Sequence, residues 1–273
     1  MSISAVLIVK NEAHHLRECL ETLTWADEIV VLDAGSQDDT CAIAREFTDH
    51  VSVNADWQGF GIQRQRAEAL ASSEWILMVD ADERVTPELR DSIKDAVQQP
   101  PAAYSVSRLS WCFGRFIRHS GWYPDRVLRL YPKHQAGYNA ALVHEKLVVE
   151  AGLAEKPLSG DLLHYTYRDL RHYLEKSAHY AQAWAEQRAA QGKTATLWQG
   201  ISHGLACFLK MYVLKAGFKD GKQGLLLALL SAHSTFAKYA DLWVRTQTSE
   251  KQRGDLVGCR VEIDGGHVLC VSA

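Results

Sequence analysis

The sequence lacks several features that mark broad classes of protein. No apolar run reaches the roughly 18 residues that a helix needs to span a bilayer, and the longest clear run covers residues 225–230. None of the six cysteines forms a C-x-x-C pair, and their scatter fits a reducing compartment better than a disulfide framework. Lys plus Arg total 30 against 33 for Asp plus Glu, so no basic excess points to nucleic acid.

Targeting and nucleotide-binding signatures are also absent. The apolar stretch at residues 2–9 is too short for a signal peptide and ends at Lys10. There is no G-x-x-x-x-G-K-[ST], and the first expected strand leads into Lys-Asn-Glu instead of G-x-G-x-x-G, so neither the P-loop nor the dinucleotide fingerprint is present. We therefore expect an intracellular protein that can touch a membrane surface but does not cross it.

The composition is that of an ordinary globular protein with an uneven charge distribution. The 273 residues are 47% hydrophobic and 23% charged, enough for one elaborated domain or a domain with an appendage. Residues 1–100 carry 8 basic and 19 acidic side chains, a net charge of −11, whereas residues 101–250 carry 19 and 11, a net charge of +8. The basic part suits an anionic partner, although solvated helices would account for the charges equally well.

The first hundred residues alternate between strand-like and helix-like patterns. Apolar runs predict buried strands, and the segments between them have helical spacing or capping residues; the strands are expected at 3–9, 28–32, 51–53 and 75–79, and the helices at 11–23, 38–47 and 61–71. This alternation predicts an α/β fold with a mostly parallel sheet and helices on both faces. Ligands of such sheets bind beyond the carboxyl ends of the strands, where Asp33, Asp80 and Asp82 stand.

The rest of the chain has two parts. Residues 100–165 are rich in aromatic residues and Arg, and residues 167–243 have a mostly helical pattern. Strand-like pieces occur at 103–109, 127–131 and 146–149, and helices are expected at 170–191, about 197–214 and 223–243. We expect a catalytic domain at 1–165, a helical region at 166–250 and a tail at 251–273. The tail fits either a hairpin around Asp264 or a loosely ordered extension, and we assign it no function.

The sharpest chemical signal is Asp80-Ala81-Asp82. Two carboxylates at the end of a buried strand repel each other, and a hard cation such as Mg²⁺ or Mn²⁺ would remove that repulsion and bridge to diphosphate oxygens. A solvated loop that caps the next helix is the alternative. Asp33, at the end of the second strand, could accept hydrogen bonds from a ribose or base, or from the amides of its own turn.

Four segments in combination resemble glycosyltransferase family 2, which has the GT-A fold: residues 5–12, 31–40, 59–70 and 75–83. The chain is more closely similar to bacterial lipopolysaccharide inner-core β-1,4-glucosyltransferases at residues 121–132, 143–145 and 208–243. The resemblance covers roughly residues 2–245. It implies a UDP-sugar donor, in particular UDP-glucose, a lipid-linked core oligosaccharide as acceptor, and Mg²⁺ or Mn²⁺ as cofactor.

The resemblance also implies roles for individual residues. Asp33 matches the aspartate that contacts uracil, Asp80 would lie near ribose or base, and Asp82 would hold the cation with His164 as a further ligand. Asn11, Glu12 and Gln65 would complete the nucleotide-sugar site, Gln65 standing where many members have Asn.

The resemblance also implies that Glu145 is the catalytic base, because it stands where many members carry an Asp and an inverting displacement needs one carboxylate to take the proton of the acceptor hydroxyl. His144 is its rival.

Cationic and aromatic residues suggest how the acceptor is held. Arg126 and Arg129 are three residues apart, so on a strand they lie on opposite faces, and one of them could grip an anionic group beside Trp122. The basic, apolar helices within 205–245 suit an anionic membrane surface, with one face packed on the protein.

We therefore predict a metal-dependent inverting hexosyltransferase, peripheral on the cytoplasmic face of the inner membrane. Three alternatives remain open at this stage. They are a transferase with a galactose or heptose donor, a nucleotidyltransferase, and a non-enzymatic membrane-binding protein with a degenerate fold.

Overall fold

The computed structural model describes residues 1–141, 145–257, 259–264 and 267–272, with side chains described as far as residue 247. The chain folds into two compact units. The first consists of Met1–Arg118 and Trp122–Thr166, and the second of His119–Gly121 and Tyr167–Ala273. The expected domain boundaries at 165/166 and 250/251 stay a prediction.

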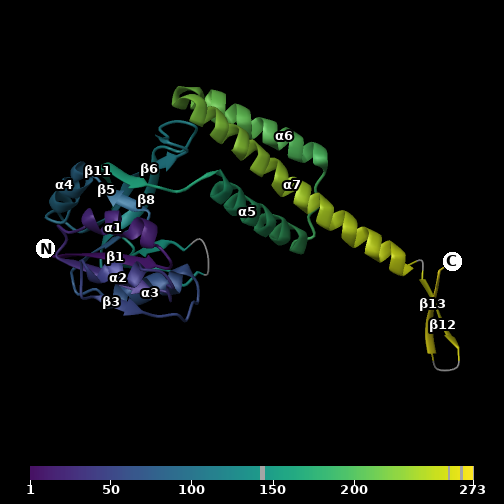
Figure 1. Cartoon of the computed structure of the whole chain (residues 1–273), viewed down its shortest axis with the longest axis horizontal. Helices are drawn as coiled ribbons and strands as arrows, with labels where there is room; N and C mark the ends of the chain where they lie inside the picture. The colour runs from purple at the N-terminus through teal and green to yellow at the C-terminus, as the bar shows by residue number, and fades with distance from the viewer. Residues whose placement is uncertain (142–144, 258, 265–266, 273) are drawn as a thin grey trace. The chain divides into compact units, whose positions relative to one another are not determined.

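The first unit is built on one nine-stranded sheet (Figure 1). Its strand order is β3 (Val51–Val53), β2 (Glu28–Asp33), β1 (Ile3–Val9), β4 (Trp75–Met78), β8 (Asp125–Pro132), β6 (Ala102–Cys112), β11 (Ala154–His164) and β5 (Glu83–Val85), with β7 (Arg115–Phe116) paired to β6. The first four strands are parallel. Beyond them β8 is antiparallel to both neighbours and β11 is parallel to β6, so the second half of the sheet is mixed. The predicted α/β class is confirmed.

Helices cover both faces of this sheet because its strands are apolar on both sides. Leu7 of β1 packs in one cluster with Leu16 of α1 (Ala13–Glu21) and Ala44 of α2 (Thr40–Arg45), and α4 (Pro87–Ala96) joins the same face. The neighbouring residue Val6 points the other way and clusters with Ala67 of α3 (Phe60–Leu70). The short pair β9 (Ala136–Tyr138) and β10 (Leu147–Val149) also belongs to this second face. Alternation along β1 thus sets the layers of the unit.

The second unit is helical, as the sequence predicted. It contains α5 (Leu170–Ala190), α6 (Leu197–Phe208), a π-helical turn η1 (Leu209–Leu214), a 3₁₀ turn η2 (Gly217–Asp220) and α7 (Gly221–Val257). The expected helix at 197–214 therefore changes to π geometry over its last six residues. The antiparallel pair β12 (Cys259–Asp264) and β13 (His267–Ser272) agrees with the hairpin alternative for the tail. Within the residues described, no helix combines the length and the apolar character needed to cross a membrane.

Candidate functional site

The turn after β2 holds Asp33 in a buried position. Its side-chain Oδ1 accepts hydrogen bonds from the backbone N–H groups of Gly35 and Ser36, each at 2.8 Å. The Ser36 hydroxyl donates to Asp33 Oδ2 and accepts from the Asn11 N–H at 2.8 Å. Ser36 therefore links the carboxyl ends of β1 and β2 and brings Asn11 close to Asp33. Groups of its own turn therefore donate to both carboxylate oxygens of Asp33. This agrees with the alternative in which Asp33 serves to stabilise the turn.

Asn11 and Glu12 fasten the end of β1 to the start of α2. The Glu12 N–H donates to Thr40 Oγ1 at 2.8 Å, and Asn11 Oδ1 accepts from the Gln37 N–H at 2.8 Å. Asn11 has a φ of +55°, a left-handed conformation that asparagine tolerates better than most residues. Asn11 and Glu12, which the family resemblance assigns to the donor site, thus lie at the same sheet edge as Asp33.

Asp80, two residues beyond the end of β4, lies between two buried arginines. Its Oδ1 accepts from Arg64 Nη2 at 2.8 Å, and its Oδ2 accepts from Arg129 Nη2 at 2.5 Å. Burial disfavours the charged carboxylate, but the attraction of Arg129 and Arg64 outweighs it and holds the pKa of Asp80 well below its usual range. Asp80 is therefore a fixed anion at physiological pH.

Glu83 forms the inner end of the same network. It is fully buried, its Oε1 accepts from Arg129 Nη2 at 2.8 Å, and its Oε2 accepts from the Asp80 N–H at 2.9 Å. Burial raises the pKa of Glu83, and the negative charge of Asp80 acts in the same direction against the opposing effect of Arg129. Arg108 Nη1 approaches Glu83 Oε1 at 3.8 Å. Arg129 thus binds two carboxylates at once.

Glu145, the predicted base, joins this network through Arg64. Arg64 Nε donates to Glu145 Oε1 at 3.0 Å, while the same guanidinium holds Asp80 and lies over the Tyr138 ring at 5.1 Å from its centre. One buried guanidinium therefore fixes two carboxylates that are 65 positions apart in the sequence. His144, the rival base, lies outside the described residues.

Asp82 and His164, the two predicted metal ligands, are brought together. Asp82 Oδ2 lies 3.4 Å from His164 Nε2, and His164 Nδ1 lies 3.2 Å from Ser110 Oγ. If Nδ1 carries the proton and donates to Ser110, the Nε2 lone pair faces Asp82. Among the residues described, no three His, Cys, Asp or Glu side chains gather as a metal site. A carboxylate with one imidazole fits a divalent cation whose other ligands come from a diphosphate and water.

Four predicted residues remain. Gln65, Arg126 and Trp122 take no part in the ion pairs described above, and Arg129 binds the protein's own carboxylates in them. Gln65 Nε2 donates to the backbone carbonyl of Tyr138 at 2.7 Å, so this amide ties α3 to β9. Arg126 is exposed and Arg129 buried, which agrees with their expected opposite faces on β8. Arg129 binds two carboxylates of the protein itself, those of Asp80 and Glu83. Trp122 is half-buried in the segment before β8.

Arg64, Glu83 and Ser110 were not singled out from the sequence. Arg64 lies in the segment 59–70 and immediately precedes Gln65, and Glu83 immediately follows Asp82, so both stood inside recognised motifs. Ser110 carries no sequence signal, because its contact with His164 depends on the pairing of β6 with β11.

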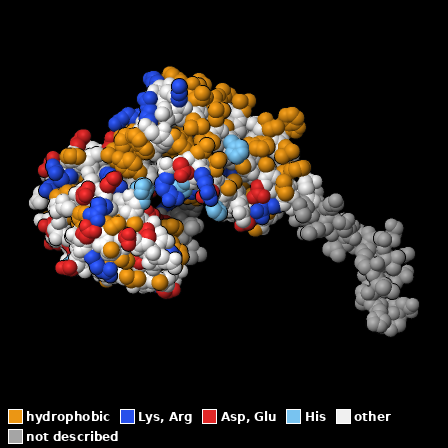
Figure 2. All heavy atoms as spheres, in the orientation of Figure 1, with side chains coloured by type: hydrophobic (Ala, Val, Ile, Leu, Met, Phe, Trp, Pro, Cys, Tyr) orange, Lys and Arg blue, Asp and Glu red, His pale blue; other side chains and the backbone are white. Residues whose placement is uncertain are grey.

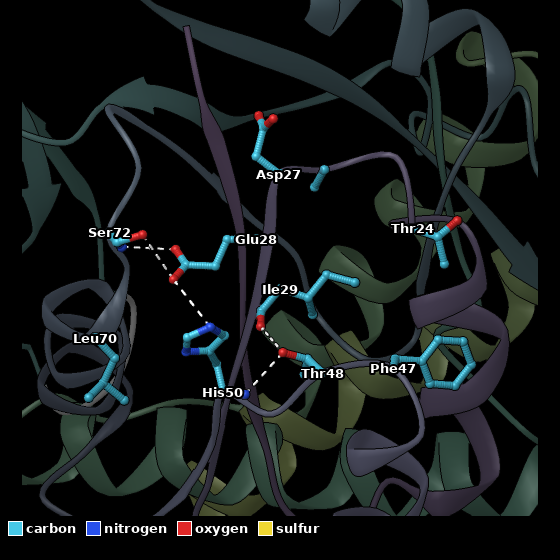
Figure 3. Close-up of a pocket in the computed structure, with 10 residues that line it drawn as sticks. Thr24, Asp27, Glu28, Ile29, Phe47, Thr48, His50, Leu70 and Ser72 are labelled. Carbon is cyan, nitrogen blue, oxygen red and sulfur yellow. Dashed lines mark hydrogen bonds and ion pairs between the residues drawn. The ribbon is translucent and has the colours of Figure 1, made fainter.

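A polar hollow opens at the opposite end of the strands (Figure 3). Glu28, the first residue of β2, bonds there to Ser72, and its carboxylate lies 4.0 Å from His50 Nε2. Asp33 ends the same strand, so this hollow and the acidic residues described above lie at opposite edges of the sheet.

Comparison with known proteins gives a family-model match over residues 4–149, described as Glycosyl transferase family 2. The lipopolysaccharide core biosynthesis glycosyltransferase LpsC of Rhizobium meliloti is 27% identical over 252 residues, covering 90% of this chain and 93% of that protein. An uncharacterized glycosyltransferase of Rickettsia prowazekii is 26% identical over 260 residues, with 90% and 89% covered. Among solved structures, S. aureus TarS 1-349 in complex with UDP-GlcNAc aligns with a TM-score of 0.43 at 15% identity, covering 100% and 97%.

Proposed function

Because the chain belongs to glycosyl transferase family 2, we propose that it is an inverting hexosyltransferase that moves glucose from UDP-glucose onto a heptose of the lipopolysaccharide inner core. The chain is a glycosyltransferase, and the similarity to LpsC over nine-tenths of its length supports the core saccharide as acceptor. The observation that supports this reaction most is the buried Arg64, which holds Glu145 and Asp80 together.

Asp82 and His164 would hold the divalent cation, Mg²⁺ or Mn²⁺. Their 3.4 Å approach already directs a carboxylate oxygen and an imidazole nitrogen toward each other. When bound, the cation supplies charge neutralisation for the departing diphosphate. Ser110 would fix the imidazole tautomer that leaves Nε2 free for the metal.

Glu145 would act as the general base. The acceptor hydroxyl oxygen attacks the anomeric carbon and its proton passes to the Glu145 carboxylate, while the bond from that carbon to the diphosphate oxygen breaks and the anomeric configuration inverts. Arg64 would orient Glu145 for this transfer, because it binds Oε1 and leaves the second carboxylate oxygen for the hydroxyl.

The donor nucleotide would lie along the edge formed by the ends of β1, β2 and β4. Asn11, Glu12 and Asp33 stand at the first two strand ends, Asp80 follows the third, and Gln65 comes from α3. In this proposal the turn of Asp33 faces the uracil, and Asp80, kept ionised by its arginines, faces the ribose.

The acceptor would be a lipid-linked saccharide presented at the cytoplasmic face of the inner membrane. Arg126 is the exposed cation of its pair and would meet an anionic group of the acceptor beside Trp122, whereas Arg129 serves the carboxylates of the protein. The helical region 166–250 would carry the membrane association.

Calorimetric titration of UDP, with and without Mn²⁺, tests the donor site. Wild-type protein should bind UDP in a metal-dependent manner, and Asp82→Ala should lose that dependence. Asp95→Ala, which removes an exposed carboxylate on α4, is the matched control and should bind as wild type does. If no UDP binds under any metal condition, the donor proposed here is wrong, and ADP-sugars would be titrated next.

A further inference from the structure

Helix α6 has two opposite faces, and only one of them is packed within the unit. Gly200 and Gly204 are buried, and a Cβ at Gly200 would lie 3.1 Å from the ring of Phe236 on α7. A Cβ at Gly204 would meet the backbone carbonyl of Ala232 at 3.1 Å. These glycines let α6 and α7 pack closely, and they fix which side of α6 is turned outward.

The outward side carries a continuous apolar stripe. Trp198, Ile201, Leu205 and Leu209 follow one another at spacings of three and four residues, so they share one face. All four are exposed, Trp198 to 79% and Leu205 to 58%. The apolar surface continues past the end of α6 with Val213, Leu214 and Phe218, which are also exposed. Figure 2 shows hydrophobic side chains gathered over α6 and α7.

Positive charge lies at one end of this stripe, next to the turns η1 and η2. Lys210, Lys215, Lys219 and Lys222 are all exposed. The sequence from 197 to 230 contains a single acidic residue, Asp220. Asp220 is buried, where it accepts from the His119 N–H at 2.9 Å and lies 3.0 Å from His119 Nδ1. Every charged side chain that this segment exposes is therefore a cation.

We propose, resting on the membrane location proposed above, that this face of α6 is the surface by which the protein docks on an anionic lipid bilayer. The stripe from Trp198 to Leu209 enters the interface, and the four lysines contact lipid phosphates at its η1–η2 end. An apolar stripe flanked by lysines is the pattern of helices that lie in a bilayer interface without crossing it. A second copy of this chain fits the face less well, because a two-fold contact pairs the face with itself and the segment 197–230 exposes no acidic side chain to meet the lysines.

The structure refines the sequence-based expectation for this region. The expectation placed the basic, apolar surface between residues 205 and 245, whereas the stripe begins at Trp198. Arg245 is engaged elsewhere, since its Nε lies 3.1 Å from Asp241 and its Nη2 lies 3.4 Å from Glu186. The docking surface is thus the outer face of α6 with the turns that follow it, and the inner face packs on α7.

Cosedimentation of the full chain with phospholipid vesicles tests the proposal. Wild type should bind phosphatidylcholine vesicles that contain phosphatidylglycerol and should bind pure phosphatidylcholine far less. Leu205→Ser should weaken binding about 10-fold or more, because a leucine side chain no longer leaves water. Lys210→Gln combined with Lys222→Gln should weaken it about 30-fold, from roughly 1 kcal/mol for each lysine. Leu174→Ser and Lys193→Gln, exposed on α5 and in the loop after it, are controls that should bind as wild type does.

Three results would overturn the proposal. They are equal binding to both kinds of vesicle, full binding by the Leu205→Ser protein, and a dimer in solution that Leu205→Ser dissociates. In the last case the face would be an interface between copies. UDP titration on the same samples separates this test from the enzymatic proposal, because the vesicle measurement requires neither donor nor turnover.

Discussion

At the scale of single residues, Glu145 is the most direct test of the chemistry. Glu145→Gln keeps an oxygen acceptor for Arg64 Nε but cannot take a proton, so kcat should fall at least about 100-fold while UDP binding changes little. Glucosyl transfer assays and UDP calorimetry measure the two quantities. Glu150→Gln, an exposed carboxylate five positions along the chain, should behave as wild type. Full turnover by Glu145→Gln would mean that another group is the base.

Arg129 provides a test of stability at the same scale. Arg129→Met removes the shared partner of Asp80 and the fully buried Glu83, which leaves Glu83 without its nearest cation and Asp80 with Arg64 alone. The free energy of unfolding should fall by about 3–5 kcal/mol in urea titrations. Arg126→Met, on the exposed side of the same strand, should change it by less than about 0.5 kcal/mol. Similar losses in both variants would argue against a special role for the buried network.

The depressed pKa of Asp80 makes its contribution to stability depend on pH. A carboxyl whose pKa is lower in the folded than in the unfolded chain stabilises the fold above its unfolded pKa, near 3.9, and loses this effect as pH falls toward the folded value. The raised pKa of Glu83 acts in the opposite direction, because its stabilising effect is present at low pH and fades as pH rises through the folded value. The difference in unfolding free energy between wild type and Asp80→Asn should therefore be largest near neutral pH and shrink below about pH 4. A difference that stays constant down to pH 2 would contradict this.

At the scale of elements, Gly160 controls how β11 lies against α4. Gly160 has a φ of +85°, and a Cβ there would come within 2.3 Å of the Leu89 backbone nitrogen. Gly160→Ala should therefore lower the free energy of unfolding by about 2 kcal/mol or more. Gly152→Ala is a matched control, because Gly152 also has a positive φ, +92°, but a Cβ there would meet nothing within 4 Å. It should cost only the backbone strain, about 1–2 kcal/mol. Equal effects, measured by thermal unfolding, would show that the close approach to Leu89 relaxes without cost.

The elements also show which parts of the fold can be read from the sequence. The strands β1 and β3 have the predicted limits. The apolar run of β1 fits a buried strand and little else, whereas the three residues of β3, which are half-buried or exposed, are delimited by the helical segments on either side. The strand β11 was not predicted, since its first four residues are exposed, Pro157 interrupts its pattern, and its register shifts between Pro157 and Asp161. Pairing with neighbouring strands determines the extended conformation of such a segment more than its own residues do.

The same limit applies to the candidate site. Asp80 and Asp82 could be found because they follow a buried strand, and Glu145 and His164 because the chain resembles a family. Their contacts could not be predicted, since His164 reaches Asp82 only through the pairing of β11 with β5 and β6. The bridging position of Arg64 likewise depends on α3 packing beside the end of β4, which no local pattern reports.

At the scale of the whole molecule, we propose that the charge asymmetry of the sequence reflects two separate tasks. The residues proposed for donor binding and chemistry all belong to the first unit, whereas the lysines and apolar stripe proposed for lipid docking belong to the second. Asp82 and Leu205 are each at least partly exposed, so substituting them removes no core interaction.

We therefore expect the two tasks to be separable by single substitutions. Asp82→Ala should lose metal-dependent UDP binding and still sediment with anionic vesicles, and Leu205→Ser should show the reverse, with UDP affinity within about two-fold of wild type. Transfer to a soluble core saccharide should survive Leu205→Ser, whereas transfer to an acceptor embedded in vesicles should fall together with binding, because membrane association raises the local acceptor concentration. If Leu205→Ser lowered both transfer rates equally, α6 would act on catalysis itself. A role confined to lipid docking would then be excluded.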